Sequence, residues 1–242
     1  MKIGNPNSRN KLSIPRSAYV LDVGSGHNPH PRANVIADKF IDTNYHRADN
    51  IKILNNQKFV EADGQALPFK DKEFDYVICC HVVEHVDDPT RFLTELSRVG
   101  KKGYLEAPSL VGELLIPKES HQWVLLDIDK KIILVNKKRL GFNTSLDFGE
   151  LFLDFLPKNS IGFKILQRTH PQLLTINYEW SEKIEFEVDP PDEKLRNYFT
   201  TVWDRNMYHS IFPKRTLAQE FWATTKAFVD ILGSVIKSKL LK

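Results

Sequence analysis

The chain has 242 residues, of which 41% are apolar, and a formal net charge of +3 at pH 7. This length and composition allow one well-buried core, or one core with a sizeable appended region. The small net charge does not indicate a nucleic-acid partner. No stretch approaches the roughly 18 uninterrupted apolar residues of a membrane span, and the polar residues 1–16 lack the apolar segment of a secretory signal.

The only two cysteines are the neighbours Cys79 and Cys80, inside a segment that we expect to be a buried strand. Adjacent side chains of a strand point to opposite faces, which does not favour a disulfide between them. We therefore expect free thiols and a cytoplasmic location.

Residues 1–16 are expected to form a mobile or loosely docked arm. The apolar residues 19–23 that follow predict a buried strand, which ends in a turn containing Gly24 and Gly26. A glycine has no Cβ, so the backbone can bend sharply there and approach a ligand closely. Asp22 stands near the carboxyl end of this strand, where open α/β sheets bind ligands, and its charge suits a cationic ligand.

Two further strands are expected to end at an acidic residue. The first covers residues 34–38 and closes on Asp38, and the second covers residues 58–63 and closes on Asp63, which precedes Gly64. Only residues 27–33 link the first two strands, and their two prolines discourage a helix, so we expect a stunted first helix at most.

The next segments alternate between strand and helix. Residues 74–81 predict a buried strand, residues 89–99 a helix capped by an acidic residue, and residues 103–107 another strand. This order is typical of a doubly wound parallel sheet. The apolar runs 121–126 and 131–135 predict a hairpin, which we expect to form an antiparallel edge of the same sheet.

From residue 138 onward the alternation stops. We expect a helix over residues 146–156, a strand over 180–188 and a long helix over 214–242, which carries six basic and two acidic residues. Such a helix can contact an anionic membrane surface or a second subunit, but we favour packing on its own domain. Aromatic faces in this region either line an acceptor pocket or belong to the core; the candidates are Trp180, Trp203, Tyr208 and His209.

Taken together, the motifs of residues 19–107 resemble the class I S-adenosylmethionine-dependent methyltransferases, in particular the UbiE-like small-molecule family. The resemblance implies a Rossmann-like α/β fold with a mostly parallel seven-stranded sheet whose last strand is antiparallel, followed here by a C-terminal α+β extension. The motifs that carry it are Leu21 to Gly26, Asp38, Ala62 to Phe69, Phe74-Asp75, Val82 to Val86, and Asp88-Pro89.

The resemblance also implies a cofactor site. In this family the glycine turn wraps the methionine part of S-adenosylmethionine, the second acid holds the ribose hydroxyls, and an acid after the third strand meets the adenine amino group. A carboxylate suits both partners, because it accepts hydrogen bonds from a diol or from an amino group. The residues so assigned are Asp22, Gly24, Ser25, Gly26, Asp38, Asp63, Gly64 and His81.

Transfer to a hydroxyl also requires a base. His81, at the end of its strand, is the first candidate, followed by Glu84 and His85; the alternative role of His81 is contact with the cofactor. We expect no metal site, because the spacing of His27, His30 and His46 with Asp38 matches no zinc pattern.

The sequence thus predicts a methyltransferase that acts on a small or medium acceptor, with oxygen as the favoured acceptor atom and a glycan or glycolipid intermediate as the suggested substrate. We expect residues 1–16 to be the arm, 17–137 the cofactor domain, and 138–242 a cap or acceptor region. Two alternatives are a nicotinamide-dependent oxidoreductase and a non-catalytic module that binds cofactor or a partner; Asn28, where the family has a third glycine, keeps the latter open.

Overall fold

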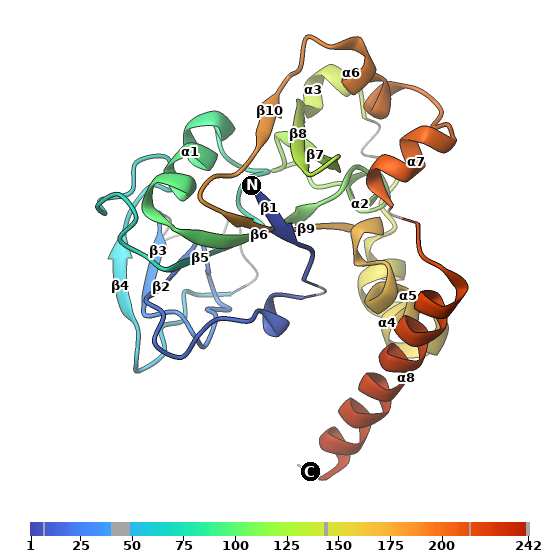
Figure 1. Cartoon of the computed structure of the whole chain (residues 1–242), viewed down its shortest axis with the longest axis horizontal. Helices are drawn as coiled ribbons and strands as arrows, with labels where there is room; N and C mark the ends of the chain where they lie inside the picture. The colour runs from blue at the N-terminus through green and yellow to red at the C-terminus, as the bar shows by residue number, and fades with distance from the viewer. Residues whose placement is uncertain (7, 40–48, 143–144, 213, 241–242) are drawn as a thin grey trace.

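A seven-stranded sheet forms the centre of the computed structural model, which describes residues 1–6, 8–39, 49–142, 145–212 and 214–240 (Figure 1). The central strands are parallel, whereas β9 runs antiparallel to both of its neighbours. This arrangement confirms the predicted fold class. In spatial order the strands are β4 (Lys58–Glu61), β3 (Val35–Asp38), β2 (Val20–Val23), β5 (Tyr76–Cys80), β6 (Lys102–Pro108), β9 (Thr175–Ser181) and β1 (Lys2–Gly4).

The predicted helix is α1 (Pro89–Val99), which packs on one face of this sheet. Its first turn forms because the Asp88 side chain accepts a hydrogen bond from the Arg91 N–H at 2.9 Å and Pro89 occupies the first turn. As expected, no helix forms among residues 27–33 between β2 and β3. Both cysteines are free.

The predicted hairpin exists, but its expected place in the structure is wrong. Strands β7 (Trp123–Ile128) and β8 (Lys131–Asn136) pair with each other and form a separate three-stranded sheet with β10 (Phe186–Val188). Their side chains are buried on both faces, one toward the main sheet and the other toward α6 and α7. A hairpin that is apolar on both faces forms an inner layer, so the antiparallel strand of the main sheet comes from β9 instead. Residues 180–188 hold the end of β9 and all of β10 rather than one strand.

The N-terminal arm is not loosely docked, contrary to the expectation. β1 pairs with β9 and so runs in the direction of the central strands, while Leu12 and Ile14 pack on the sheet face opposite α1. In the described part of the chain, the apolar cluster on this face contains Leu12, Ile14 and Ala18 besides residues of the sheet. The arm therefore supplies apolar cover that would otherwise be missing.

The C-terminal region completes the main sheet through β9 and surrounds the smaller sheet with helices, so the sheet crosses the predicted boundary at residue 138. The division into domains stays a prediction. The remaining elements are η1 (Arg9–Lys11), α2 (Leu110–Leu115), α3 (Lys137–Leu140), the π-helical η2 (Glu150–Phe155), α4 (Leu156–Asn159), α5 (Ile161–Thr169), η3 (Pro171–Leu173), α6 (Glu193–Thr200), α7 (Arg205–Ile211) and α8 (Leu217–Leu240).

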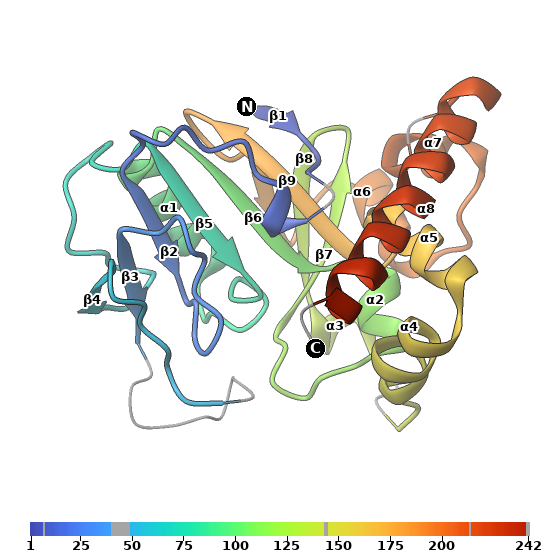
Figure 2. The ribbon, with the colours of Figure 1, turned by 90° about the horizontal axis from the view of Figure 1, so that it is seen from below.

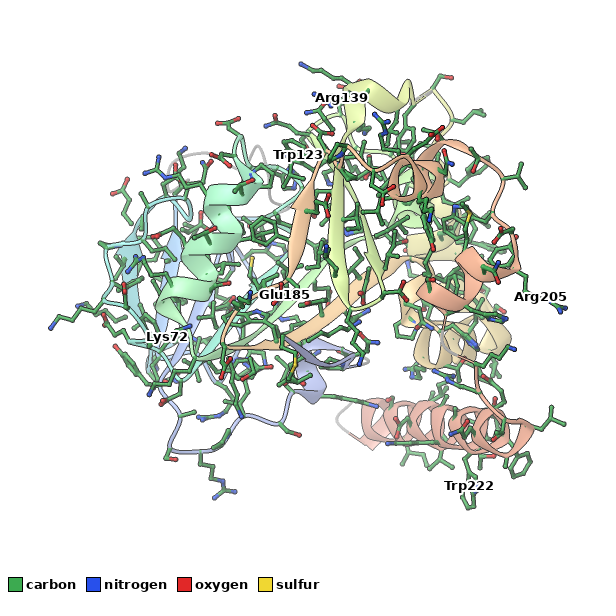
Figure 3. The ribbon with its side chains drawn as sticks, turned by 45° about the horizontal axis from the view of Figure 1, so that its top comes forward. Lys72, Trp123, Arg139, Glu185, Arg205 and Trp222 are labelled. Atoms are coloured by element: carbon green, nitrogen blue, oxygen red, sulfur yellow. The ribbon has the colours of Figure 1, made fainter. Side chains whose placement is uncertain are left out.

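Helix α8 forms where predicted and packs along α5 (Figure 2). Most of its apolar stripe is exposed to solvent; the stripe consists of Leu217, Phe221, Phe228, Ile231 and Val235. Ile231 is 5% exposed, whereas Leu217 is 91% and Phe221 68% exposed. Trp222 projects away from the rest of the chain (Figure 3). Packing on its own domain therefore accounts for only part of the stripe. None of the helices in the described ranges is long and apolar enough to cross a membrane.

The contact between β6 and β9 yields a stability prediction. A Cβ on Gly103 would lie 2.5 Å from the Val77 carbonyl oxygen and 2.6 Å from the Trp180 ring. We expect Gly103→Ala to lower the free energy of unfolding by about 1–3 kcal/mol, because backbone and a buried ring cannot easily move aside. Urea denaturation measures the change. The control is Gly233→Ala in α8, where a Cβ meets nothing within 4 Å and alanine should stabilise the helix by about 0.5–1 kcal/mol. Equal changes in the free energy of unfolding for the two substitutions would contradict the close packing at Gly103.

Candidate functional site

A cavity of about 930 Å³ lies at the carboxyl edge of the parallel strands. Its walls come from the loops after β2, β3, β4 and β5, and from segments next to β7 and β8. Seven of the residues predicted from the sequence line it: Gly24, Gly26, Asp38, Asp63, Gly64, His81 and His85.

Glycines let the backbone itself form part of the cavity wall. Gly24 and Gly26 have φ values of 68° and 52°, in the left-handed region that residues with a Cβ rarely adopt. A Cβ on Gly24 would also lie 2.4 Å from a Val82 methyl group. The N–H of Gly26 donates to Oδ2 of Asp38 at 3.2 Å, which holds the turn against the end of β3.

Asp38, the last residue of β3, and Asp63, which follows β4, both line the cavity. Asp38 is buried, and Asp63 accepts hydrogen bonds from Lys39 Nζ at 2.7 Å and from the Gln65 N–H at 2.9 Å. Burial opposes ionisation of Asp63, but these hydrogen bonds outweigh it and hold its pKa below the usual value. Asp63 therefore enters the site as a carboxylate. Sequence reasoning missed Lys39 and Gln65, although each is close in sequence to one of the two acids.

Asp22 and Ser25 are not among the lining residues. Asp22 is buried; its Oδ2 accepts from the His30 N–H at 2.8 Å and lies 3.4 Å from Arg9 Nη2. Burial raises the pKa of Asp22 to about 6, although His30 and Arg9 oppose the rise. Its contacts tie the arm and the loop after β2 to the strand. The buried Ser25 hydroxyl has no hydrogen-bond partner among the described residues.

His81 is held between two carboxylates at the end of β5. Its Nε2 lies 3.2 Å from Glu106 Oε1, and its Nδ1 lies 3.4 Å from Glu84 Oε1. Desolvation opposes the charged ring, but Glu106 and Glu84 outweigh it and raise the pKa of His81 to about 10. A protonated imidazole donates hydrogen bonds and has no lone pair for another proton. The roles of base and of cofactor contact both stay predictions.

A second cavity of about 420 Å³ adjoins the first at His81 and His121, which line both. It also contains Glu106, and its other walls are largely apolar, with side chains from Leu153, Phe163, Leu166, Leu173 and Leu174. Glu84 is buried behind the wall of the first cavity, whereas His85 lines it. The three predicted catalytic residues thus lie together, close to the junction of the two cavities.

Of the two alternatives for the C-terminal aromatics, the structure favours packing in the core for Trp180 and Trp203. None of Trp180, Trp203, Tyr208 and His209 lines either of the two cavities. Trp180 lies in the main core, and Trp203 packs against the second core. The wall opposite the glycine turn comes instead from residues near the ends of the hairpin, which sequence reasoning missed because it treated the hairpin as a sheet edge: His121, Gln122, Asn136, Lys137, Lys138 and Phe142.

The histidines that were weighed as metal ligands have other surroundings. His30 Nε2 lies 3.1 Å from the Arg9 carbonyl oxygen, and its Nδ1 accepts from the Arg32 N–H. His27 is exposed, and His46 lies outside the described residues.

A comparison with known families bears on the part of the chain that carries the glycine turn and the two acids. Residues 21–105 match the family model described as a methyltransferase domain. This match covers about a third of the chain and supports a class I S-adenosylmethionine-dependent methyltransferase. The cofactor of this domain is therefore S-adenosylmethionine, and the residues present suit it: the wall offers two carboxylates and a turn in which Gly24 and Gly26 expose the backbone.

The matches to individual relatives cover less than half of each relative's length. A protein of Methanocaldococcus jannaschii that has no assigned function is 30% identical over 94 residues, 35% of this chain and 46% of that protein. A malonyl-[acyl-carrier protein] O-methyltransferase of a Marinomonas species is 26% identical over 125 residues, 48% of this chain and 46% of that enzyme. The chain thus spans less than half the length of these relatives.

Among solved structures, the protein PH0226 of Pyrococcus horikoshii is 19% identical, with a TM-score of 0.37 over 69% of this chain and 82% of that one.

The buried carboxylate of Asp22 yields a pH prediction. Its pKa is about 6 in the folded chain against 3.8 for the unperturbed group, so the folded state holds more protons between these values. The free energy of unfolding should therefore fall as the pH rises from 4 to 7, by up to about 3 kcal/mol from this group. Asp22→Asn removes this titratable group. The free energy of unfolding of the wild type relative to that of the variant should therefore fall as the pH rises from 4 to 7.

Urea denaturation at several pH values measures that difference. The exposed Asp71→Asn is the matched control and should follow the wild-type curve. A difference between wild type and Asp22→Asn that does not depend on pH would contradict the prediction.

Proposed function

We propose that this protein transfers a methyl group from S-adenosylmethionine to an oxygen atom of a small or medium acceptor, as a UbiE-like enzyme located in the cytoplasm. The observation that carries the proposal is that the glycine turn, Asp38 and Asp63 line one cavity together with residues 119–142. Its volume of about 930 Å³ is near the upper end of pockets for one drug-sized ligand, roughly 300–1,000 Å³.

Each cofactor group has a matching partner on the wall. Asp38 would accept hydrogen bonds from the ribose hydroxyls, and Asp63 would accept one from the adenine amino group. The backbone at Gly24 and Gly26 would lie against the methionine part, where Asp38 also adds negative charge near the cationic groups. When bound, the cofactor supplies a methyl group already activated on a sulfonium. The protein then has to align the acceptor, which can provide most of the rate.

The second cavity is our proposed acceptor site. It joins the first at His81 and His121, and it combines a polar end at Glu106 with apolar walls from Phe163 and Leu166. Such a site suits an amphipathic molecule whose hydroxyl group reaches the junction, as in a glycan or glycolipid intermediate. The relative that is described as an O-methyltransferase supports oxygen as the acceptor atom. We propose that His81 positions this hydroxyl as a hydrogen-bond donor and that Glu84 or His85 receives its proton.

Calorimetric titration tests the cofactor assignment. We expect S-adenosylmethionine and S-adenosylhomocysteine to bind and NAD not to bind. Asp38→Ala should weaken both interactions by about 10- to 100-fold, because a carboxylate that accepts hydrogen bonds contributes about 1.5–3 kcal/mol. The control Asp71→Ala removes an exposed carboxylate outside the cavity and should leave affinity unchanged. Binding of NAD alone would favour the oxidoreductase alternative, and binding without turnover of any acceptor would favour the non-catalytic module.

The acceptor proposal has its own test. The enzyme would be incubated with S-adenosylmethionine carrying a ¹³C-methyl group and with glycolipids or the corresponding free sugars, and the products examined by NMR. We expect an O-methyl signal with the glycolipids. Leu166→Arg should abolish it by placing a charge in the apolar second cavity, while the affinity for S-adenosylmethionine stays unchanged. Transfer to nitrogen, or full activity of Leu166→Arg, would contradict this acceptor site.

Exposed apolar side chains on α8, which packs along the α5 wall of the second cavity, suit peripheral contact with a membrane that holds such an acceptor. This contact is part of the same proposal.

A further inference from the structure

Glu84, His85 and His121 converge beside the first cavity. One ligand atom of each lies within 4.8 Å of the ligand atoms of the other two. The two imidazole rings stand nearly perpendicular, at 78°, with centroids 4.7 Å apart. Two imidazoles and one carboxylate form a common ligand set for divalent first-row transition metals.

Hydrogen bonds set the orientation of both rings. His121 Nδ1 lies 2.5 Å from Oε2 of the buried Glu113, and His85 Nδ1 lies 3.1 Å from the Ser120 carbonyl oxygen. A carboxylate and a carbonyl can only accept, so each Nδ1 carries the proton and each Nε2 presents its lone pair. A histidine that donates to a carboxylate in this way is the usual arrangement around protein-bound metals. Glu113 is itself fixed by Lys137 Nζ at 2.5 Å.

The third ligand is a buried carboxylate whose charge is offset by His81 but whose oxygens lack a hydrogen-bond partner among the described residues. Glu84 is 1% exposed, and neither of its carboxylate oxygens has a hydrogen-bond partner among the described residues. The nearest polar contact recorded for it is His81 Nδ1, at 3.4 Å. Burying a carboxylate without hydrogen bonds is costly. A cation bound by Glu84 would remove this cost, which is an observation independent of the histidine geometry.

Backbone contacts hold the ligands in place before any ion binds. The Glu84 carbonyl oxygen accepts from the N–H groups of Gln122 at 2.7 Å and of Trp123 at 3.2 Å. The Gln122 side chain donates to the His85 carbonyl oxygen at 3.0 Å. The segment that carries His121 is thereby fastened to the segment that carries the other two ligands.

We propose that Glu84, His85 and His121 bind one divalent first-row transition-metal cation. Three protein ligands leave coordination positions open, as in catalytic zinc sites. His85 and His121 line the first cavity, so these positions would face it and take water or the hydroxyl oxygen of the acceptor. A cation there would make that hydroxyl more acidic. This role rests on the proposed function, whereas binding of the ion does not. The ligand set replaces the sequence-based expectation that no metal site is present.

Metal titration of the full chain, after removal of metals with a chelator, tests the proposal. Zn²⁺ and Mn²⁺ would be followed by calorimetry, and Co²⁺ by its visible absorption. We expect one ion per chain. His121→Gln and His85→Gln should each weaken binding by at least about 100-fold, and Glu113→Gln, which acts through His121, by about 10- to 100-fold. His209→Gln is the control, because His209 lines neither cavity.

Circular dichroism would establish that each variant is folded, and each would also be titrated with S-adenosylmethionine. Normal cofactor binding without binding of any of the three ions would overturn the metal site and leave the proposed function standing. Metal binding without cofactor binding would support the metal site and overturn the proposed function. An affinity for Zn²⁺ that is unchanged in both His121→Gln and His85→Gln would also overturn the proposal.

Discussion

The parallel pairing of β2, β3 and β5 is the constraint on which the site depends. Val23 pairs with Ala37 on one side and with Cys79 on the other, so the three strands end at nearly the same level. Their loops therefore open at one edge, where the glycine turn, Asp38 and His81 meet. Each strand is buried, and a slip in register would move its apolar residues to the wrong face. The packing that stabilises the sheet thus also places the site residues.

The C-terminal region belongs to this arrangement rather than being attached to it. Strand β9 pairs along the full length of β6, and the hairpin of β7 and β8 lies between the main sheet and helices α6 and α7. The hairpin ends bring His121 and Lys137 to the cavity wall. The cavity is therefore lined both by residues of the family match and by later residues.

Several charged groups at the site are buried or held in ion pairs. Asp22 is enclosed with an elevated pKa, Glu84 is buried without hydrogen bonds to its carboxylate, and His81 stands between Glu84 and Glu106 with a left-handed backbone, φ 57°. Such arrangements cost stability and are more frequent at functional sites than elsewhere. Here they occur together at the carboxyl edge, next to the glycine turn.

Local patterns in the sequence determined the central strands, helix α1 with its Asp88 cap and the acids near the strand ends, because hydrophobic periodicity and capping act over a few residues. Only the tertiary structure decided which strand closes the sheet, that the arm covers one face, and that His121 joins Glu84 and His85. Pairing between distant segments depends on which exposed edges and faces remain to be covered, and neither the apolar hairpin nor residues 175–181 carry that information locally.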